Sequence, residues 1–586
     1  MQQRDISILN QRKTFRYRFL ESLLGITSLS FLLLILILSF VRRDIAAVIL
    51  ITYSFLWVLK FALNAIYTIY TYIQVRRWEE FAWSRFAKYS IAGNRDRVKG
   101  MLVDFRDKYQ GKIDWTSKLN KDIRNWIDID GTAFENPMSM KHVAIFSIYN
   151  ESVEVVERSL KCIYKSKYPI ENLIVVITQE ARVGKEHTQA FRKQLGRIDW
   201  IEVTDIQEKD LDIVYHAHHD KLDYSNAKLK KVSFSKTKLN VFFTMHPDGL
   251  VGEIKGKASN EDWAGRQASL LLKSKNIQPD HVLVTSLDAD SHVGTYFFHH
   301  LSYNYCLNEN RKYCGYQPVH VYSNNFFETG IWQRQIATQN TLTNMMYLGI
   351  EDETHFFAIY SVPMSVLQEI NFWVREVIGE DYMIYAKCLA HYGEKFRVIP
   401  FYGVFEGDAV EADDYIEAII NQYKQLQRWT WGGVESFPYM FTKFFIEPEG
   451  SKIDLRKRIK YTASLFSEHF FWASTPLLLS IGVILPQFIG GEQFRQTPVS
   501  QNLSMFITYF AWISFLFIII FSYITFKYVV SRAYDKQKHS FGHNFLVVLQ
   551  WLVMPLVFGF ASIPALDSQI RGIRGKYLGY WVTPKK

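Results

Sequence analysis

The chain has 586 residues, a formal net charge of +10, 48% hydrophobic and 16% aromatic residues, and four cysteines. This composition excludes a disordered chain, which would hold few aromatic residues, a collagen-like chain, which would need far more than 30 glycines, and a disulfide-rich scaffold. The length predicts more than one folded unit. The cysteines form no CxxC pair, which argues against structural zinc and favours a reducing compartment.

Two apolar runs, residues 19–41 and 45–75, predict a transmembrane hairpin within residues 1–78. The first run is about 23 residues long and would reach roughly 35 Å as a helix, enough for a hydrocarbon core of about 30 Å. The second run contains Lys60, which must snorkel or face protein. Basic residues before the first run and after the second predict that both flanks lie in the cytoplasm.

A polar, tryptophan-bearing connector (79–138) leads into short β-rich runs that alternate with helix-like stretches. Residues 142–147, 173–178, 281–287 and 315–321 predict strands, and residues 152–164 predict a helix. This alternation predicts an α/β domain over residues 139–412, with a mostly parallel sheet and ligands beyond the carboxyl ends of its strands.

The aromatic and basic residues of 413–460 predict helices in the membrane interface. Three apolar segments follow, 465–489, 505–530 and 545–565, within a C-terminal transmembrane region (461–570). Three full spans would put the tail (571–586) outside, whereas its basic residues predict the cytoplasmic side. We therefore expect one segment not to cross. The candidate is 545–565, with Pro555 and Pro564, and a break near Pro476 is the alternative.

An Asp-x-Asp pattern occurs three times, at 128–130, 210–212 and 288–290. Only Asp288 and Asp290 directly follow a strong apolar strand, which would deliver two carboxylates to the ligand-binding rim of the sheet. Carboxylates suit Mg²⁺ or Mn²⁺, and these ions neutralise a diphosphate. A solvated turn is the alternative reading of the motif alone.

Three further features follow in order: Tyr149-Asn150-Glu151, Gly379-Glu380-Asp381 and Gln425-Leu426-Gln427-Arg428-Trp429. Together with Asp288-Ala289-Asp290 they resemble the membrane-bound family 2 glycosyltransferases, the group of the cellulose, chitin and hyaluronan synthases, over residues 139–440. The resemblance implies a GT-A-like domain inserted between transmembrane helices.

The resemblance also implies a role for each motif. Asp288 and Asp290 would hold a divalent cation, and Asp381 would be the general base, supported by Glu380. Arg428 would clamp the diphosphate, while Gln425 and Trp429 would face the acceptor. The remaining donor-site candidates are Asn150, Glu151, Lys257 and Asn260. A solvated Asp-Glu pair and an interfacial Arg-Trp pair are the alternatives for 380–381 and 428–429.

Residues 580–585, Tyr-Trp-Val-Thr-Pro-Lys, resemble the gating loop of cellulose synthases, which implies that Thr583 and Lys585 approach the diphosphate. A frayed basic end is the alternative. Many family members carry two aspartates after the second strand, but this chain has Glu180 as its only acid there, so Glu180 is a further donor-site candidate. The long stretch 182–252 includes His216, His218, His219 and Asp220, which we interpret as a polar insertion rather than a metal site.

We therefore expect an inverting, metal-dependent hexosyltransferase of the plasma membrane with a cytoplasmic catalytic domain. Its partners would be a nucleotide-diphosphate sugar, with a UDP-sugar favoured, a glycan or glycolipid acceptor, and the bilayer, with no nucleic acid. The alternative is a non-catalytic membrane receptor or transporter subunit with a nucleotide-sensing α/β domain. In that case Lys60, Glu468 and His469 would line a pathway.

Overall fold

The computed structural model describes residues 7–109, 136–206, 234–350, 353–447, 452–482, 484–536 and 550–583. Within these ranges nine strands form one sheet in the order β3-β4-β2-β1-β5-β8-β7-β9-β6. The strands are β1 (Lys141–Ile148), β2 (Leu173–Glu180), β3 (Ile201–Asp205), β4 (Leu239–His246), β5 (Val282–Leu287), β6 (His292–Val293), β7 (Cys314–Tyr322), β8 (Tyr360–Pro363) and β9 (Arg397–Gly407). The helices before and around the sheet are α1 (Ile8–Gln11), α2 (Phe15–Val41), α3 (Arg43–Glu79), α4 (Trp83–Ile91), α5 (Arg95–Tyr109), α7 (Val153–Tyr164), α8 (Lys185–Leu195), α9 (Lys257–Ser274), α10 (Phe297–Cys306), α11 (Ile331–Gly349), α12 (Met364–Glu369) and α13 (Glu380–Tyr392). The helices that follow the sheet are α14 (Tyr415–Phe441), α15 (Leu455–Leu477), α16 (Leu485–Arg495), α17 (Pro498–Ile524), α18 (Ser531–Lys536) and α20 (Met554–Arg574).

The sheet is mostly parallel, as the alternating pattern predicts. Strand β1 pairs in parallel with β2 and β5, and β4 pairs in parallel with β2 and β3, whereas β8 runs antiparallel to β5 and β7. All four strands predicted from the sequence are present, as is the helix predicted at 152–164. Five further strands were not predicted, because each is either short or interrupted by polar residues: β3, β4, β6, β8 and β9.

Successive residues of β1 enter two different cores. Ala144, Phe146 and Ile148 pack with helices α7, α8 and α10 on one face of the sheet. Val143 and Ile145 pack with α9, α12 and α13 on the other face. Side chains alternate across a strand, so a strand covered on both faces becomes apolar throughout. Because both faces of the sheet are covered, a ligand site is expected at the strand ends, where the side chains become polar.

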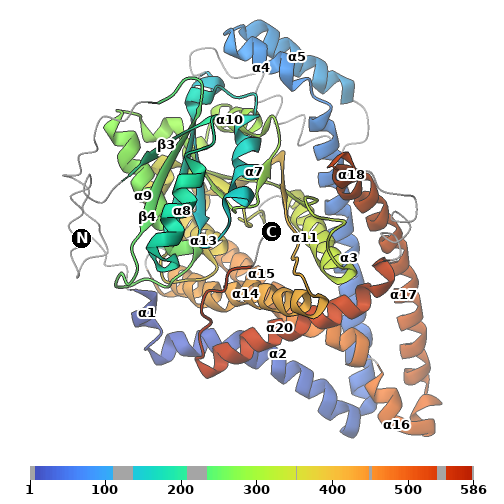
Figure 1. Ribbon diagram of the computed structural model, residues 1–586. Helices are drawn as coiled ribbons and strands as arrows, with labels where there is room; N and C mark the ends of the chain where they lie inside the picture. The colour runs from blue at the N-terminus through green and yellow to red at the C-terminus, as the bar shows by residue number, and fades with distance from the viewer. Residues whose placement is uncertain are drawn as a thin grey trace.

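The connector is partly helical and packs on the sheet domain. Helices α4 and α5 bring Trp83, Phe86 and Phe105 onto α10, where Trp83 lies 4.9 Å from the ring of His300. Figure 1 shows this pair above the sheet at the end of the long helix α3. The connector therefore fixes the end of α3 to the domain.

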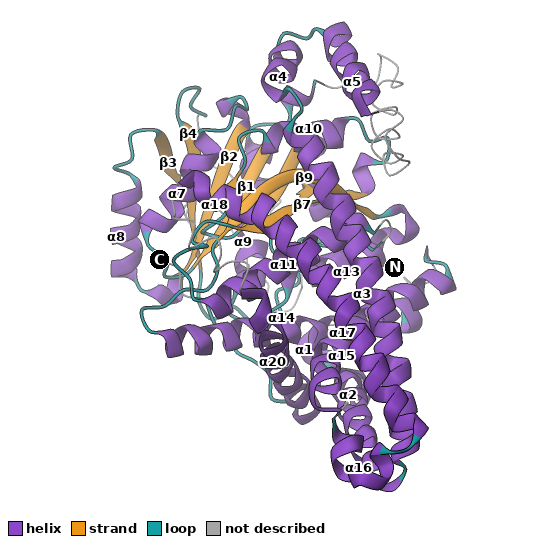
Figure 2. Ribbon diagram, turned by 90° about the vertical axis from the view of Figure 1, so that its right-hand side faces the viewer, coloured by secondary structure: helices purple, strands orange, loops and turns teal. Residues whose placement is uncertain are grey.

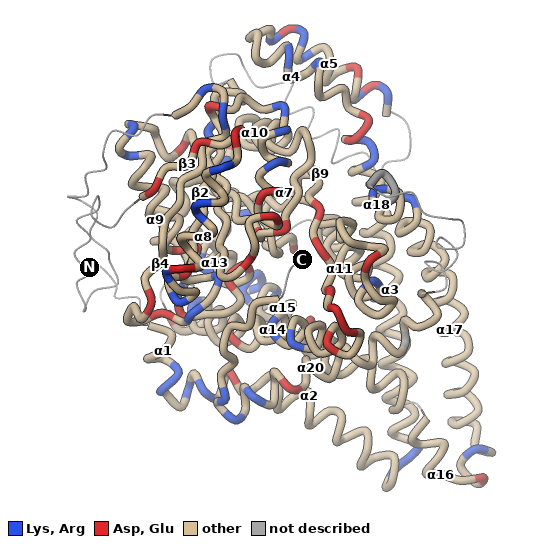
Figure 3. Tube along the Cα trace, in the orientation of Figure 1, with Lys and Arg blue, Asp and Glu red and all other residues tan. Residues whose placement is uncertain are grey.

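Four helical segments of the described residues are long and apolar enough to cross a membrane: Phe15–Val41, Arg43–Glu79, Leu455–Arg495 and Pro498–Ala533. They form the bundle below the sheet domain, with α16 at its far end (Figure 2). Their outward residues are large and apolar, as at Leu34, Phe55 and Trp512. Figure 3 shows Lys and Arg gathered at the start of α2 and few charges along α17.

Two of these helices precede the sheet domain and two follow it. With all four crossing a membrane, the segment before α2, the sheet domain and the segment after α17 would lie on the same side. Helix α20, which contains most of the predicted third segment, is not among the four, while residues 545–549 lie outside the described residues. It packs against α2, α14 and α15 instead. Helix α14 is one long helix between the sheet domain and α20, and several of its aromatic side chains, including Trp431 and Phe437, are buried.

Candidate active site

A cavity of about 290 Å³ lies beyond the carboxyl ends of β1 and β5, between the sheet and helix α14. It collects side chains from motifs that are far apart in the sequence. The predicted site residues that line it are Glu151, Lys257, Asp288, Asp290, Glu380, Asp381, Gln425, Arg428, Trp429 and Thr583. The structure thus brings most of the predicted motifs to a single place, in front of the strand ends where the fold predicts a ligand.

The Asp-x-Asp motif forms the turn directly after β5. Asp288 N–H donates to Ser291 Oγ at 3.0 Å, which closes the turn. Asp290 is buried and its Oδ2 accepts from Asp408 N at 3.0 Å. The side chain of Asp288 is 39% exposed and faces the cavity. The two carboxylates therefore differ: Asp290 is buried, whereas Asp288 is partly exposed to the cavity.

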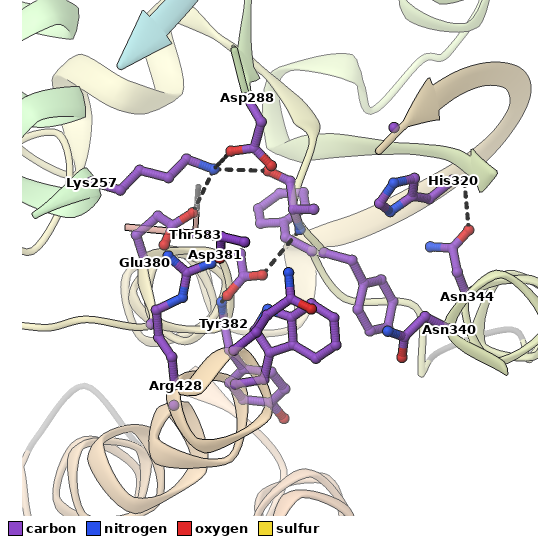
Figure 4. A pocket seen from close by; sticks show the side chains of 18 of the residues that line it. Lys257, Asp288, His320, Asn340, Asn344, Glu380, Asp381, Tyr382, Arg428 and Thr583 are labelled. Atoms are coloured by element: carbon purple, nitrogen blue, oxygen red, sulfur yellow. Dashed lines mark hydrogen bonds and ion pairs between the residues drawn. The ribbon is translucent and has the colours of Figure 1, made fainter. Parts of the chain in front are cut away.

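Lys257, at the start of α9, is the centre of the acidic cluster (Figure 4). Its Nζ lies 2.9 Å from Asp288 Oδ1, 2.9 Å from Glu380 Oε1 and 3.1 Å from the carbonyl oxygen of Ala358. Burial alone lowers the pKa of this ammonium, but the surrounding carboxylates raise it well above its ordinary value. Lys257 is therefore a permanent cation that links the metal-site candidate to the Glu380-Asp381 pair.

A further carboxylate, which sequence reasoning missed, lies behind this lysine. Glu261 is fully buried, one helical turn after Lys257 on α9, with its Oε1 3.7 Å from Lys257 Nζ. Its side chain also accepts hydrogen bonds from Ser286 and, at 3.4 Å, from Tyr360. Burial raises the pKa of Glu261. The (i, i+4) spacing of Lys257 and Glu261 is the signal that could have indicated the pair.

Glu380 and Asp381 begin helix α13, so the positive end of the helix faces their carboxylates. Asp381 Oδ2 accepts from Ala358 N at 3.1 Å and its Oδ1 accepts from Tyr382 N at 2.8 Å. Burial raises the pKa of Asp381 above its ordinary value, against these two hydrogen bonds, which lower it. The carboxylate is thus fixed in orientation and more basic than an exposed aspartate.

The loop before α13 is held by a second buried acid that the sequence did not reveal. Glu435 Oε2, from α14, accepts from Ile378 N at 2.8 Å and from Gly379 N at 3.3 Å. A Cβ at Gly379 would lie 2.9 Å from the Cα of Gly432, so glycine is needed for this close approach of α13 to α14. The two helices together set the place of Asp381.

Helix α14 delivers the third motif to the cavity. Gln425 Oε1 accepts from Gln422 Nε2 at 3.0 Å, and Trp429 lies half-buried at the wall. Arg428 donates to the carbonyl oxygen of Trp581 at 3.3 Å, and its guanidinium lies 5.2 Å from the centre of the Tyr580 ring. The single cation of this motif therefore points into the cavity, toward the C-terminal segment.

The C-terminal segment crosses the cavity instead of lying apart from it. Tyr580, Val582 and Thr583 line the cavity, and Thr583 is buried. A Cβ at Gly256 would lie 2.7 Å from the ring of Tyr580, so this segment packs closely on the turn before Lys257. Lys585 lies outside the described residues, as do His216, His218, His219 and Asp220.

Three predicted donor-site residues do not line this cavity. Asn150 is exposed, whereas its neighbour Glu151 does line it. Asn260 is buried and uses its amide to tie Thr178 to the carbonyl oxygen of Ile148 at 3.2 Å, so it holds the ends of β1 and β2 together. Glu180 pairs with Arg182 in a separate hollow of about 50 Å³.

Among the described residues, no group of three or more His, Cys, Asp or Glu side chains could hold a metal ion. Mg²⁺, however, is usually held by one or two carboxylates together with substrate phosphates. Asp288 and Asp290 offer such a pair at the cavity. The residues present therefore fit a cation that is held jointly by the protein and a diphosphate.

The mostly parallel sheet, the acidic turn after β5 and the cavity at the strand ends form a GT-A-like arrangement. Residues 283–561 match the sequence model of a family described as "Glycosyl transferase family group 2". Over these residues the chain is similar to this family of glycosyltransferases. No curated protein matches the chain at a significant level.

The solved structures similar to this chain include the following two. One is the mannosyltransferase PcManGT of Pyrobaculum calidifontis in complex with GDP-Man and Mn²⁺, at 12% identity and a TM-score of 0.37, covering 79% of this chain and 96% of that one. The other is residues 1–349 of S. aureus TarS in complex with UDP-GlcNAc, at 12% identity and a TM-score of 0.31, covering 75% of this chain and 93% of that one.

Proposed function

We propose that this protein is a membrane-integral, inverting glycosyltransferase that moves a sugar from a nucleotide-diphosphate sugar to a hydroxyl of a growing polysaccharide or lipid-linked acceptor. The observation that carries the proposal is the shared cavity, in which an acidic turn, a fixed carboxylate and a partly buried arginine meet. In this proposal the catalytic domain faces the cytoplasm, where nucleotide sugars are made.

The donor occupies the side of the cavity that holds the cations. Arg428 pairs with the diphosphate by charge-assisted hydrogen bonds, and Lys257 keeps Asp288 and Glu380 in place beside it. Asp288 and Asp290 would hold Mg²⁺ or Mn²⁺, which neutralises negative charge on the diphosphate when bound. These groups stabilise the charge that develops as the nucleotide leaves.

Asp381 acts as the general base. Its carboxylate takes the proton of the acceptor hydroxyl while that oxygen attacks the anomeric carbon from the face opposite to the diphosphate. The new glycosidic bond forms as the bond to the diphosphate breaks, so the configuration inverts. The two backbone hydrogen bonds to Asp381 hold the carboxylate in the orientation this step needs.

The C-terminal segment, residues 580–583, covers the donor. Tyr580 lies over both Arg428 and the turn at Gly256, and Thr583 points into the same cavity. We infer that this segment shifts when the donor enters and then shields the diphosphate from water. Thr583 and Lys585 are its proposed donor contacts.

The acceptor enters from the membrane side. The cavity extends to Glu468, His469 and Trp472 of α15, which is part of a helix apolar enough to cross a membrane. A transferase for small soluble acceptors needs no such extension. It supports a membrane-bound acceptor or a product that leaves through the bundle, and we favour polysaccharide synthesis, with Gln425 and Trp429 at the acceptor.

Release of free nucleoside diphosphate tests the proposal. The purified full-length protein would be incubated with UDP-glucose, UDP-GlcNAc and GDP-mannose, with Mg²⁺, Mn²⁺ or EDTA. We expect release from one donor, its loss with EDTA, and its recovery with excess metal. If the protein binds a nucleotide sugar but releases no more nucleoside diphosphate than the Asp381→Asn variant does, a nucleotide-sensing receptor would be favoured instead.

A further inference from the structure

One wall of the cavity belongs to a helix that the proposed chemistry does not use. Helix α11 lines it with Asn340, Thr343 and Asn344. Because these positions are three and four residues apart, they share one face of the helix. In Figure 4, Asn340 and Asn344 lie on one side of the cavity, Lys257 and Arg428 lie on the other, and Asp381 lies between them.

The amide groups on this wall have hydrogen-bond capacity that the protein does not use. Within the described residues, the Nδ2 atoms of Asn340 and Asn344 have no hydrogen-bond partner. Asn344 Oδ1 accepts from His320 N at 2.9 Å, which orients the side chain and leaves its NH₂ as a donor. A buried donor without a partner costs about 1–3 kcal/mol, so a ligand oxygen here would be favoured. The broad χ2 torsion of asparagine lets the amide of Asn340 turn toward such an oxygen.

The neighbouring surface of this end of the cavity is aromatic. Ile336, one turn before Asn340 on α11, packs with Trp429 of α14 and Trp472 of α15, and both tryptophans line the cavity. A flat apolar ring beside neutral amide donors matches a sugar ring, which has apolar C–H faces and a rim of hydroxyl oxygens. A phosphate or other anion would instead need the cations, which lie on the opposite side.

We propose that α11 is the recognition wall for a saccharide acceptor, with Asn340 and Asn344 as hydroxyl-binding residues and Trp429 and Trp472 as its apolar surface. This inference rests on the proposed glycosyl transfer and names its acceptor class: the unit beside Asp381 is a sugar ring, as in a growing glycan. A phosphorylated lipid would present no sugar ring to these amides.

Binding measured without a donor tests the inference separately from catalysis. The probes are tetrasaccharides of glucose, N-acetylglucosamine and mannose, and vesicles that contain polyprenyl phosphate, each added to the purified full-length protein in saturation-transfer NMR. The variants are Asn340→Leu and Asn344→Asp, the latter keeping an acceptor for His320 N–H while removing the donor. Gln339→Leu is the matched control, because Gln339 is on the same helix but does not line the cavity.

We expect one tetrasaccharide to bind and each variant to weaken it roughly three- to tenfold, as the loss of one hydrogen bond does, with the control within about twofold. In transfer assays the acceptor KM should rise by the same factor, and the donor KM by less. Unchanged tetrasaccharide binding by both folded variants would overturn the proposal, as would binding of the lipid vesicles alone. Failure of every donor to release nucleotide, with tetrasaccharide binding intact, would instead count against the proposed function.

Discussion

The Nζ atom of Lys257 lies 2.9 Å from Oδ1 of Asp288, although one residue begins helix α9 and the other follows strand β5. The same ammonium contacts Glu380, so a single buried lysine neutralises carboxylates from two motifs. Without it, Glu261 and Glu380 would lose the ammonium group that lies beside both of them.

We expect Lys257→Met to destabilise the protein by about 3 kcal/mol, because removing one partner of a buried pair leaves unpaired charge. Thermal unfolding in detergent would measure the loss. The double variant Lys257→Met/Glu261→Gln should recover part of it, since the amide has the shape of the carboxylate but carries no charge. An equal loss in both variants would show that Glu261 is not part of the cluster.

Asp381→Asn should reduce transfer by at least about 10²-fold and leave nucleotide-diphosphate binding within about twofold. The amide keeps the size of the side chain and an oxygen for one of the two backbone hydrogen bonds, but it does not accept the acceptor proton at neutral pH. Transfer and nucleotide binding would be measured on the same preparation. Asp288→Asn is the contrast, because we expect it to weaken metal-dependent nucleotide binding itself. Normal transfer by Asp381→Asn would refute the assignment of the base.

The pH dependence of the rate follows from the same carboxylate. Asp381 is needed without its proton, and burial raises its pKa, so the rate should fall as pH falls through a value above the ordinary aspartate pKa of 3.8. The check is kcat/KM between about pH 4 and 8, with thermal unfolding over the same range to exclude loss of the fold. A rate that rises toward acid pH would mean that the essential group works as an acid.

Tyr580→Ala tests the covering segment. The ring of Tyr580 lies over Arg428 and packs on Gly256, so its removal should open the donor side and increase the nucleotide KM by roughly tenfold. Hydrolysis of the donor by water should rise relative to transfer, because the diphosphate is less shielded. Thr583→Val is the milder companion, since it removes one hydroxyl and keeps the shape. If neither the nucleotide KM nor the ratio of hydrolysis to transfer changes, the segment does not cover the bound donor.

The sequence predicts the parts of this molecule that follow local rules. Apolar strands ending in Asp288 or at Tyr149, and uniform runs such as residues 19–41, are visible because burial on both sides or in a bilayer makes a whole segment apolar. Short edge strands such as β3 and β6 lack that signal. Contacts between residues far apart in the chain could not be predicted from the sequence. For example, nothing near Glu435 in the chain indicates that it binds the backbone of Gly379. The role expected of Asn260 also depended on where its side chain points, and the structure shows it bound to backbone between two strands.

The N-terminal segment reaches the site through Arg12. Arg12 is buried, and its guanidinium lies 2.9 Å from Oε1 of Glu435 and 4.2 Å from the centre of the Tyr577 ring. The other oxygen of Glu435 holds the backbone of Ile378 and Gly379, directly before Glu380 and Asp381. Glu435 is thus a positioning residue, and Arg12 supplies the charge that makes its burial tolerable.

Three variants separate the charge from the positioning. Arg12→Met should destabilise the protein by about 3 kcal/mol, since it leaves Glu435 unpaired. Glu435→Leu should lower kcat by roughly 10- to 100-fold with little change in donor KM, because the loop before Asp381 loses its anchor. The double variant Arg12→Met/Glu435→Gln carries no charge but keeps an oxygen for the two backbone N–H groups, so its kcat should recover to within about threefold of the wild type. A kcat for the double variant as low as that for Glu435→Leu would show that the ion pair itself, rather than the hold on the loop, is what the reaction requires.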